Sequence, residues 1–222
     1  MGKFGYAIKH PSWTFDYIIR EKRLSKFFGV PQDDVKQFIQ ESNSFWNIVE
    51  SKLKESKGFH RMSLERLQIL YTSIRAFKPK KMIETGVAGG STSLAILYAM
   101  RQNGGGKLYS IDIGNVMVAP GYEIGYIVPE EFRSNWSLII GDSRKELPKL
   151  LDQLKKIDCF FHDSDHSYEH MNFEFNTVFP FLNTQNLVLS DDTELNSSFD
   201  EFVSKNNYSS TSLYGFGIGK NF

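Results

Sequence analysis

The sequence predicts an α/β protein with a doubly wound, mostly parallel sheet, a helical extension before the sheet and an antiparallel hairpin after it. Three observations predict this fold. Short apolar segments alternate with longer segments of helical periodicity from about residue 60 onward. A glycine-rich turn follows the first apolar segment, and an acidic residue stands at the end of every one of them. Such strand–helix alternation is typical of parallel sheets that helices cover on both faces.

Length and charge narrow the class of protein. The 222 residues suit one α/β domain with an appendage, and we divide the chain into a helical extension or cap at 1–60 and a main domain at 61–222. Lys+Arg and Asp+Glu both number 26, so no strong field favours nucleic acid or a membrane as a partner. No apolar run approaches the roughly 18 residues of a membrane span. We expect no signal peptide, a buried free thiol at Cys159 and a cytoplasmic protein.

The helices and strands follow from local periodicity. The extension has a helix start at Pro31 and a second short helix at 45–54, and its aromatic residues are expected to pack on the main domain. Ser63 caps a clearer helix that Pro79 ends. The strands are predicted at 80–85, 107–111, 137–140, 157–162 and 187–190, with helices at 91–102, 144–155 and 170–182.

Two stretches interrupt the alternation. The connection at 114–136 is longer than most and contains aromatic residues, glycines and prolines, so we interpret it as a lid or binding loop. Near the C-terminus, residues 214–219 alternate large side chains with glycine, which predicts a strand with one crowded face.

The segment 82–91 indicates a strand, a tight turn and a helix start. Glycines at 86, 89 and 90 let the backbone turn sharply and let a ligand approach it closely. The spacing is Gly-x-x-Gly-Gly, which differs from the Gly-x-Gly-x-x-Gly of dinucleotide folds. The glycines alone also allow a turn that binds nothing.

Acidic residues are predicted to meet at one edge of the sheet, because the carboxyl ends of parallel strands lie there. Clustered carboxylates repel one another unless a cation or hydrogen-bond donors balance them. Asp112 stands where it can accept hydrogen bonds from a ribose diol. Three other carboxylates offer hard oxygen ligands for Mg²⁺, Mn²⁺ or Ca²⁺: Asp163, Asp191 and Asp192. Helix capping is the alternative for Asp191 and Asp192.

The segment 162–170 is the densest in titratable residues, and three interpretations compete. A phosphohydrolase of the HD type would need the His162-Asp163 doublet on a helix, whereas here it ends a strand. A glycosyltransferase would use Asp163 and Asp165 as its metal-binding pair. In the third interpretation Asp163 is a metal ligand and His166 a general base, which its near-neutral pKa suits. We expect His162 to be a buried strand residue and His170 to lie on a helix surface.

These motifs together resemble a class I S-adenosylmethionine-dependent methyltransferase with a Rossmann-like sheet. More narrowly, the chain is similar to the metal-dependent O-methyltransferase branch that includes macrolide-sugar methyltransferases and cephalosporin-hydroxylase-like proteins. The likeness covers roughly residues 60–192 and rests on four motifs: 84–91, Asp112, 141–143 and 163–169.

The resemblance implies a role for each matching residue. The turn would hold the methionine part of the cofactor, Asp112 the ribose, and Asp142 with Ser143 would border the adenine. Met62 and Ser63 stand where related enzymes close over the cofactor. The cofactor-binding residues are therefore expected to be Met62, Ser63, Glu84, Thr85, Gly86, Gly89, Gly90, Ser91, Asp112, Asp142, Ser143 and Asp163. The metal triad is expected to be Asp163, Asp191 and Asp192.

The resemblance predicts an O-methyltransferase that acts on a hydroxyl of a small molecule or sugar, with Mg²⁺, or else Mn²⁺ or Ca²⁺, as its metal. The metal would lower the pKa of the hydroxyl and His166 would take its proton. A metal-dependent sugar-nucleotide glycosyltransferase and a non-catalytic S-adenosylmethionine-binding protein are the alternatives. A homo-oligomer is possible, and the sequence does not identify the methyl acceptor.

Overall fold

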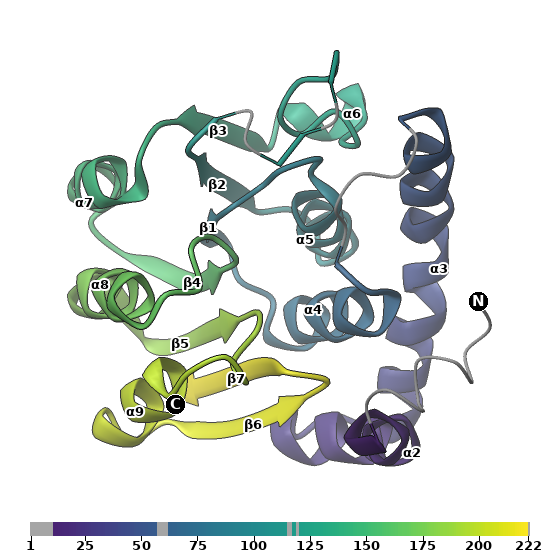
Figure 1. Cartoon of the computed structure of the whole chain (residues 1–222). Coiled ribbons are helices and arrows are strands. Elements are labelled where there is room, and N and C mark those ends of the chain that lie inside the picture. The colour runs from purple at the N-terminus through teal and green to yellow at the C-terminus, as the bar shows by residue number, and fades with distance from the viewer. Residues whose placement is uncertain (1–10, 57–61, 115–116, 119, 222) are drawn as a thin grey trace.

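A computed structural model describes residues 11–56, 62–114, 117–118 and 120–221 (Figure 1). A seven-stranded sheet has the order β3-β2-β1-β4-β5-β7-β6. The first five strands pair in parallel, β7 pairs antiparallel to β5, and β6 pairs antiparallel to β7. The strands are β1 Lys81–Thr85, β2 Lys107–Asp112, β3 Trp136–Ile140, β4 Ile157–His162, β5 Leu182–Ser190, β6 Ser209–Leu213 and β7 Phe216–Asn221. This architecture confirms the predicted doubly wound sheet and its C-terminal hairpin.

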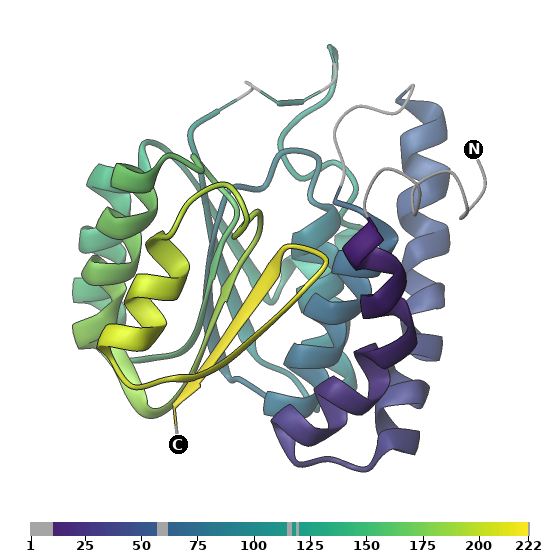
Figure 2. The same cartoon turned by 60° about the horizontal axis from the view of Figure 1, so that its bottom comes forward.

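Helices cover both faces of the sheet, as the two views in Figures 1 and 2 show. One face carries α7, α8 and α9, and the other carries α4 and α5, with α2 and α3 as a further layer outside them. The short α6 and the 3-10 helix η1 lie in connections. The helices are α2 Pro11–Phe28, α3 Gln32–Glu55, α4 Leu64–Phe77, α5 Ser91–Gln102, α6 Glu130–Arg133, α7 Ser143–Leu154, α8 Tyr168–Val178, η1 Phe179–Phe181 and α9 Ser198–Lys205.

The strand order places a crevice at the middle of the sheet. From β1 the chain moves outward through β2 to β3, and then returns to β4 on the other side of β1. In open α/β sheets, ligands bind beyond the carboxyl ends of the strands at such a reversal. The turn that follows β1 and the residues that follow β4 therefore lie side by side at the expected site.

The N-terminal helices share a core with the main sheet. Leu24 of α2 and Val35 and Phe45 of α3 are fully buried, in one cluster with Met82 of β1 and Leu108 of β2. The aromatic residues of α3 thus pack on the rest of the chain, as expected. The division of the chain at residue 60 stays a prediction.

Three predicted elements differ from the structure. One continuous helix, α3, replaces the two separate helical segments, because apolar side chains recur on one face from Val35 to Leu53. Strand β5 begins at Leu182, earlier than expected, where it pairs with Ile157 of β4. The strand predicted at 214–219 begins at Phe216 instead, because Tyr214 and Gly215, with φ values of 55° and 74°, form the hairpin turn before β7. No helix among the described residues is long and apolar enough to cross a membrane.

Candidate active site

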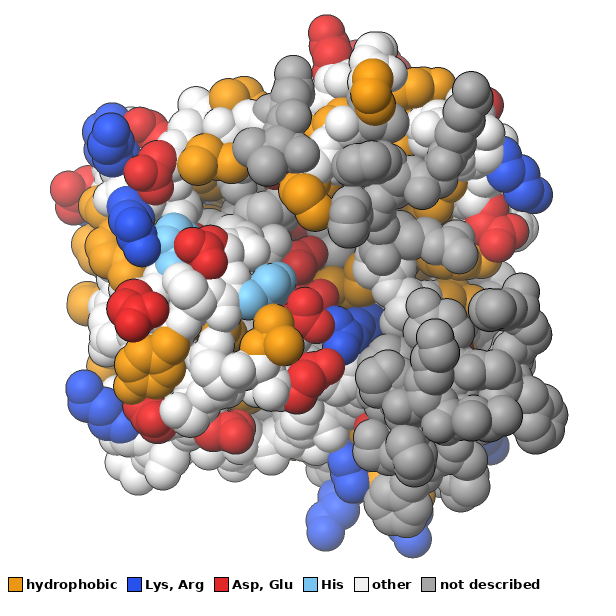
Figure 3. All heavy atoms as spheres, viewed as in Figure 1, with side chains coloured by type: hydrophobic (Ala, Val, Ile, Leu, Met, Phe, Trp, Pro, Cys, Tyr) orange, Lys and Arg blue, Asp and Glu red, His pale blue; other side chains and the backbone are white. Residues whose placement is uncertain are grey.

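A cavity of about 340 Å³ lies at the carboxyl ends of β1 to β4. Parallel strands and short turns bring residues from five separate segments to its wall. They include five of the predicted cofactor residues: Gly86, Asp112, Asp142, Ser143 and Asp163. Ile113 and Met117 add apolar side chains that are 68% and 43% exposed, a signal that the sequence motifs do not contain. Figure 3 shows carboxylates, a histidine and a basic side chain gathered in a hollow of this face.

Asp112 fastens the glycine turn to the end of β2. Its Oδ2 accepts hydrogen bonds from the backbone N–H groups of Val87, at 2.8 Å, and Ala88, at 3.0 Å. Its Oδ1 accepts one from the N–H of Gly114 at 2.9 Å. Because carboxylate oxygens accept more than one hydrogen bond each, Asp112 can hold the turn and still receive donors from a ligand.

The turn needs glycine for close contact as well as for its backbone angles. Gly86 has φ of 83°, and a Cβ on it would lie 1.8 Å from the carbonyl oxygen of Asp163. A Cβ on Gly90, which has φ of 91°, would lie 2.9 Å from Cα of Gly125. The loop predicted as a lid is thus packed on the turn, where Gly125 and Ile127 donate backbone hydrogen bonds to Ala88 and Gly89. Residues 115, 116 and 119 of this loop lie outside the described residues.

The other predicted cofactor residues do not line the cavity. Met62 is buried, Ser63 caps α4 by accepting from the N–H of Arg66, and Gly89, Gly90 and Ser91 lead into α5. Glu84 is fully buried and accepts 2.6 Å hydrogen bonds from Ser93 and Ser110. Burial raises the pKa of Glu84 to about 7, against the opposing effect of these hydroxyls. Any direct contact between these residues and a cofactor stays a prediction.

Asp142 and Ser143 form the wall after β3. Asp142 is the N-cap of α7 and accepts from the N–H of Arg144 at 2.9 Å. The Ser143 hydroxyl lies 2.9 Å from Nε2 of His170. His170 is buried, with 6% of its surface exposed, so the expectation of a surface histidine is wrong. Its ring turns inward because a buried acceptor, Glu174, lies one helical turn further along α8, at 2.9 Å.

Glu174 is the centre of a buried polar network that the sequence motifs do not indicate. The carboxylate is fully buried and accepts from Thr85 at 2.6 Å and from Ser164 at 3.0 Å. It also lies 2.7 Å from Nδ1 of His162, the strand histidine that is buried as expected. Burial alone would raise the pKa of Glu174, but the hydrogen bonds from His162 and His170 hold it well below its ordinary value. Glu174 is therefore ionised, and its hydrogen bonds join β1, β4 and α8 beside the cavity.

His166 faces the acidic edge. Its Nε2 lies 3.6 Å from Oδ2 of Asp192 and 3.9 Å from Oδ1 of Asp163, and its ring meets that of His162 edge to face at 5.3 Å. Burial and the neighbouring His162 lower the pKa of His166, against the opposing effect of Asp192. A neutral imidazole next to carboxylates can accept a proton, and the nearby charge then stabilises the imidazolium.

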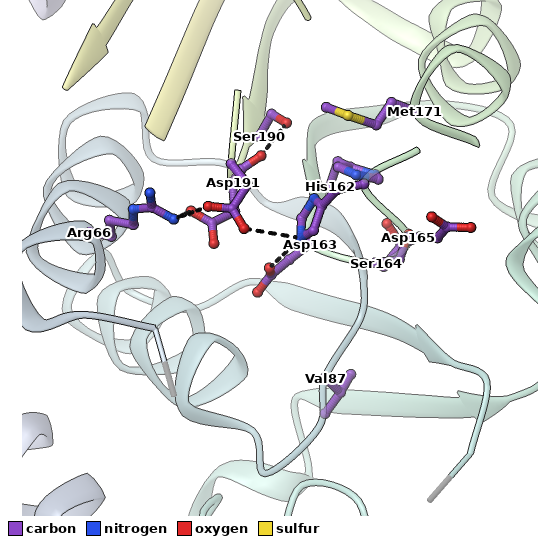
Figure 4. A network of polar contacts seen from close by, with 12 residues as sticks. Arg66, Val87, His162, Asp163, Ser164, Asp165, Met171, Ser190 and Asp191 are labelled. Atoms are coloured by element: carbon purple, nitrogen blue, oxygen red, sulfur yellow. Dashed lines mark hydrogen bonds and ion pairs between the residues drawn. The ribbon is translucent and has the colours of Figure 1, made fainter. Parts of the chain in front are cut away.

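Arg66, at the start of α4, reaches into the same edge. Its Nη1 hydrogen-bonds Oδ1 of Asp191 at 2.8 Å and also contacts Oδ1 of Asp192, and its Nη2 bonds Glu194 at 2.8 Å. Figure 4 shows Arg66 pointing toward Asp191, with Asp163 on the far side of that carboxylate. Burial would lower the pKa of Arg66, but the three carboxylates raise it, so the guanidinium stays charged. The sequence motifs do not indicate this role for Arg66.

The predicted metal triad does not fit a divalent cation in this arrangement. Among the described residues, no group of three His, Cys, Asp or Glu side chains could hold a metal ion. Asp191 and Asp192 direct oxygens to the guanidinium, and Asp192 has φ of 49°, a left-handed conformation that aims its carboxylate. Burial raises the pKa of Asp191 to about 7, which Arg66 opposes. The triad stays a prediction that a measurement of metal binding can test.

Solved structures resemble this fold. A Staphylococcus aureus protein described as a caffeoyl-CoA O-methyltransferase matches with a TM-score of 0.61 and 15% identity, over 79% of this chain and 91% of that one. An SAH-bound methyltransferase from Podospora anserina matches with a TM-score of 0.57 and 14% identity, over 86% and 94%. An O-methyltransferase from Bacillus cereus in complex with SAH has a TM-score of 0.55 and 11% identity, over 81% and 91%. No curated protein sequence matches the chain.

A family model described as a methyltransferase domain matches residues 83–193, half of the chain. The match begins within β1 and ends after β5, so it contains the glycine turn, the cavity and the acidic edge. This agrees with the class I methyltransferase resemblance of the motifs, while the narrower sugar-modifying branch stays a prediction. The chain therefore belongs to the methyltransferase domain family.

Proposed function

We propose that this protein transfers a methyl group from S-adenosylmethionine to a hydroxyl group of a small molecule or sugar. The observation that carries the proposal is the position of His166. Its Nε2 lies 3.9 Å from Asp163 and 3.6 Å from Asp192, and Asp163 lines the cavity that the glycine turn and Asp112 help to form. A base in this position suits an acceptor that must lose a proton, as a hydroxyl does.

The cavity fits the proposed cofactor. Gly86 lets the turn pack closely on Asp163 in the cavity wall, Asp112 offers acceptors for a ribose diol, and Ile113 and Met117 offer apolar contact for a flat base. Asp142 and Ser143 lie where polar contacts to that base are possible. When bound there, S-adenosylmethionine supplies an electrophilic methyl group.

The residues of the chain would then orient the acceptor and move its proton. His166 takes the hydroxyl proton at Nε2, and Asp192 stabilises the resulting imidazolium. The acceptor would lie between His166 and the methyl group, and such positioning can supply ~7–11 kcal/mol. No step requires a metal ion, because the guanidinium of Arg66 already contacts the carboxylates that would bind one.

Calorimetric titration with S-adenosylmethionine tests the proposal, once with Mg²⁺ and once with EDTA. We expect binding under both conditions, followed by transfer of a labelled methyl group to members of a panel of phenols and sugars. An absence of binding would refute the proposal, and uptake of UDP-glucose with Mn²⁺ would then favour the glycosyltransferase alternative. Binding without transfer to any acceptor would favour a non-catalytic S-adenosylmethionine-binding protein.

A further inference from the structure

We infer that Arg66 takes the place of a divalent metal ion at the acidic edge, so that methyl transfer by this protein needs no metal. The catalytic part of this inference rests on the proposed function. The structural part rests on the contacts of Arg66 and can be tested without an acceptor.

The guanidinium uses most of its donors at this edge. Besides its contacts with Asp191, Asp192 and Glu194, its Nε donates to the backbone carbonyl of Tyr214 at 2.7 Å. The side chain is only 11% exposed. The planar, fixed fork of an arginine holds several carboxylates in one geometry, which a lysine cannot do. Arg66 is therefore anchored from the end of β5 and from the hairpin turn together.

A metal ion would need the same oxygen atoms. Nη1 contacts Oδ1 of both Asp191 and Asp192, two of the oxygen atoms that the predicted triad would offer to an ion. Hard divalent cations require several such oxygens at short distance, without a competing positive charge among them. Arg66 would have to leave before an ion could bind, and its departure would break hydrogen bonds at four acceptors.

The charge at this edge explains why a cation must be present. Asp191, Asp192 and Glu194 all contact Arg66, with side chains that are 9%, 31% and 48% exposed, and Asp163 lies 3.9 Å from His166 at the same edge. Buried carboxylates that lack a counter-charge repel one another and become protonated. A cation tethered to α4 provides the counter-charge at any concentration of free metal, so a chelator cannot remove it.

Arg66 also acts on the base through a carboxylate. It holds Asp192, whose other oxygen lies 3.6 Å from Nε2 of His166. Arg66 is thus a positioning residue for His166, and proton removal from the acceptor rests on the imidazole alone.

Electron paramagnetic resonance with Mn²⁺ tests the inference at slightly alkaline pH, on the full chain. We expect no bound Mn²⁺ in the wild type. Arg66→Met is expected to gain about one Mn²⁺ per chain, because three carboxylates would then lack a counter-charge. Arg75→Met is the matched control: Arg75 lies on the same helix and is similarly buried, but it pairs with Glu41, away from the site. This control is expected to bind no Mn²⁺.

Two outcomes would overturn the inference. One is stoichiometric Mn²⁺ in the wild type that Asp192→Asn removes, which would restore the predicted metal triad. The other is a folded Arg66→Met variant that binds no Mn²⁺, since Arg66 would then not be what excludes the ion. If Arg66→Met does not fold, the wild-type result decides alone. Titration of the same samples with S-adenosylmethionine tests the proposed function separately, because cofactor binding does not depend on the Mn²⁺ result.

Discussion

Nδ1 of His162 lies 2.7 Å from Oε2 of Glu174, and both side chains are fully buried. Because the ionised carboxylate only accepts hydrogen bonds, Nδ1 carries the proton. Nε2 of His162 and Nδ1 of His166 are buried without a hydrogen-bond partner among the described residues, and the two rings are neighbours. The Glu174 carboxylate therefore sets the tautomer of His162, and the ring of His162 packs against the ring of His166, the proposed base.

Glu174→Gln should destabilise the fold, because an amide cannot accept from all the donors that surround the carboxylate. We expect the free energy of unfolding to fall by about 2–3 kcal/mol, the cost of leaving buried donors unpaired. Urea denaturation measures it. Glu169→Gln, on the exposed face of the same helix, should change stability by less than about 0.5 kcal/mol. Equal effects of the two substitutions would contradict the importance of the network.

The same network predicts a pH window for stability. The pKa of Glu174 is lowered, so its contribution is complete above pH 4.5 and is lost as the pH falls. A hydrogen bond to Glu174 raises the pKa of His170 above 6.5, so the contribution of His170 is complete below pH 6.5 and is lost as the pH rises. Both residues therefore contribute fully to the free energy of unfolding between pH 4.5 and pH 6.5.

His170→Gln tests this window. The loss of unfolding free energy relative to the wild type should be larger at about pH 5.5 than at about pH 8.5, because the charged form of His170 gains more from Glu174 than the neutral form does. Denaturant titrations at both pH values measure the difference. A loss that is constant or that grows with pH would refute the assigned direction of the His170 shift.

Asp112→Asn should weaken S-adenosylmethionine binding by roughly 10- to 100-fold, the value of a hydrogen bond to a charged group. Asp158 provides a matched control at the opposite edge of the sheet. Its Oδ2 also accepts from two successive backbone N–H groups, those of Lys80 and Lys81, both at 2.8 Å. Calorimetry on Asp158→Asn should give the wild-type affinity, and a similar loss in both variants would indicate a general effect on the fold.

Gly86→Ala should abolish cofactor binding, because the new Cβ would collide with the carbonyl oxygen of Asp163. Gly104→Ala separates this collision from backbone strain. Gly104 has a similar φ of 80°, with nothing within 4 Å of the Cβ position, so its substitution should cost only about 1–2 kcal/mol of stability. Retained cofactor affinity in Gly86→Ala would show that the turn is not the binding surface.

His166→Ala should lower the rate of methyl transfer by about 10²–10⁴-fold, the usual contribution of a general base. Cofactor affinity should stay unchanged, because His166 does not line the cavity that the cofactor is proposed to occupy. Labelled-methyl assays and calorimetry on the same sample give both quantities. Unchanged turnover would refute the assignment of His166 as the base.

The sequence alone determined the place of the five parallel strands, the glycine turn and the acidic residue at the end of each of these strands. These features depend on local periodicity and on backbone angles that short segments impose. Since parallel strands end at one edge, the approach of Asp112, Asp142 and Asp163 to a common cavity could also be predicted.

Only the tertiary structure decided which charges meet. Arg66 contacts Asp191 across 125 residues, and Thr85 reaches Glu174 across 89. These pairs depend on how α4 and α8 pack against the sheet, which no local pattern specifies. The sequence indicated that the acidic edge needs a cation or hydrogen-bond donors to balance it. The position of α4 placed a guanidinium there, because a helix packed at the end of β5 brings a long basic side chain within reach of both aspartates.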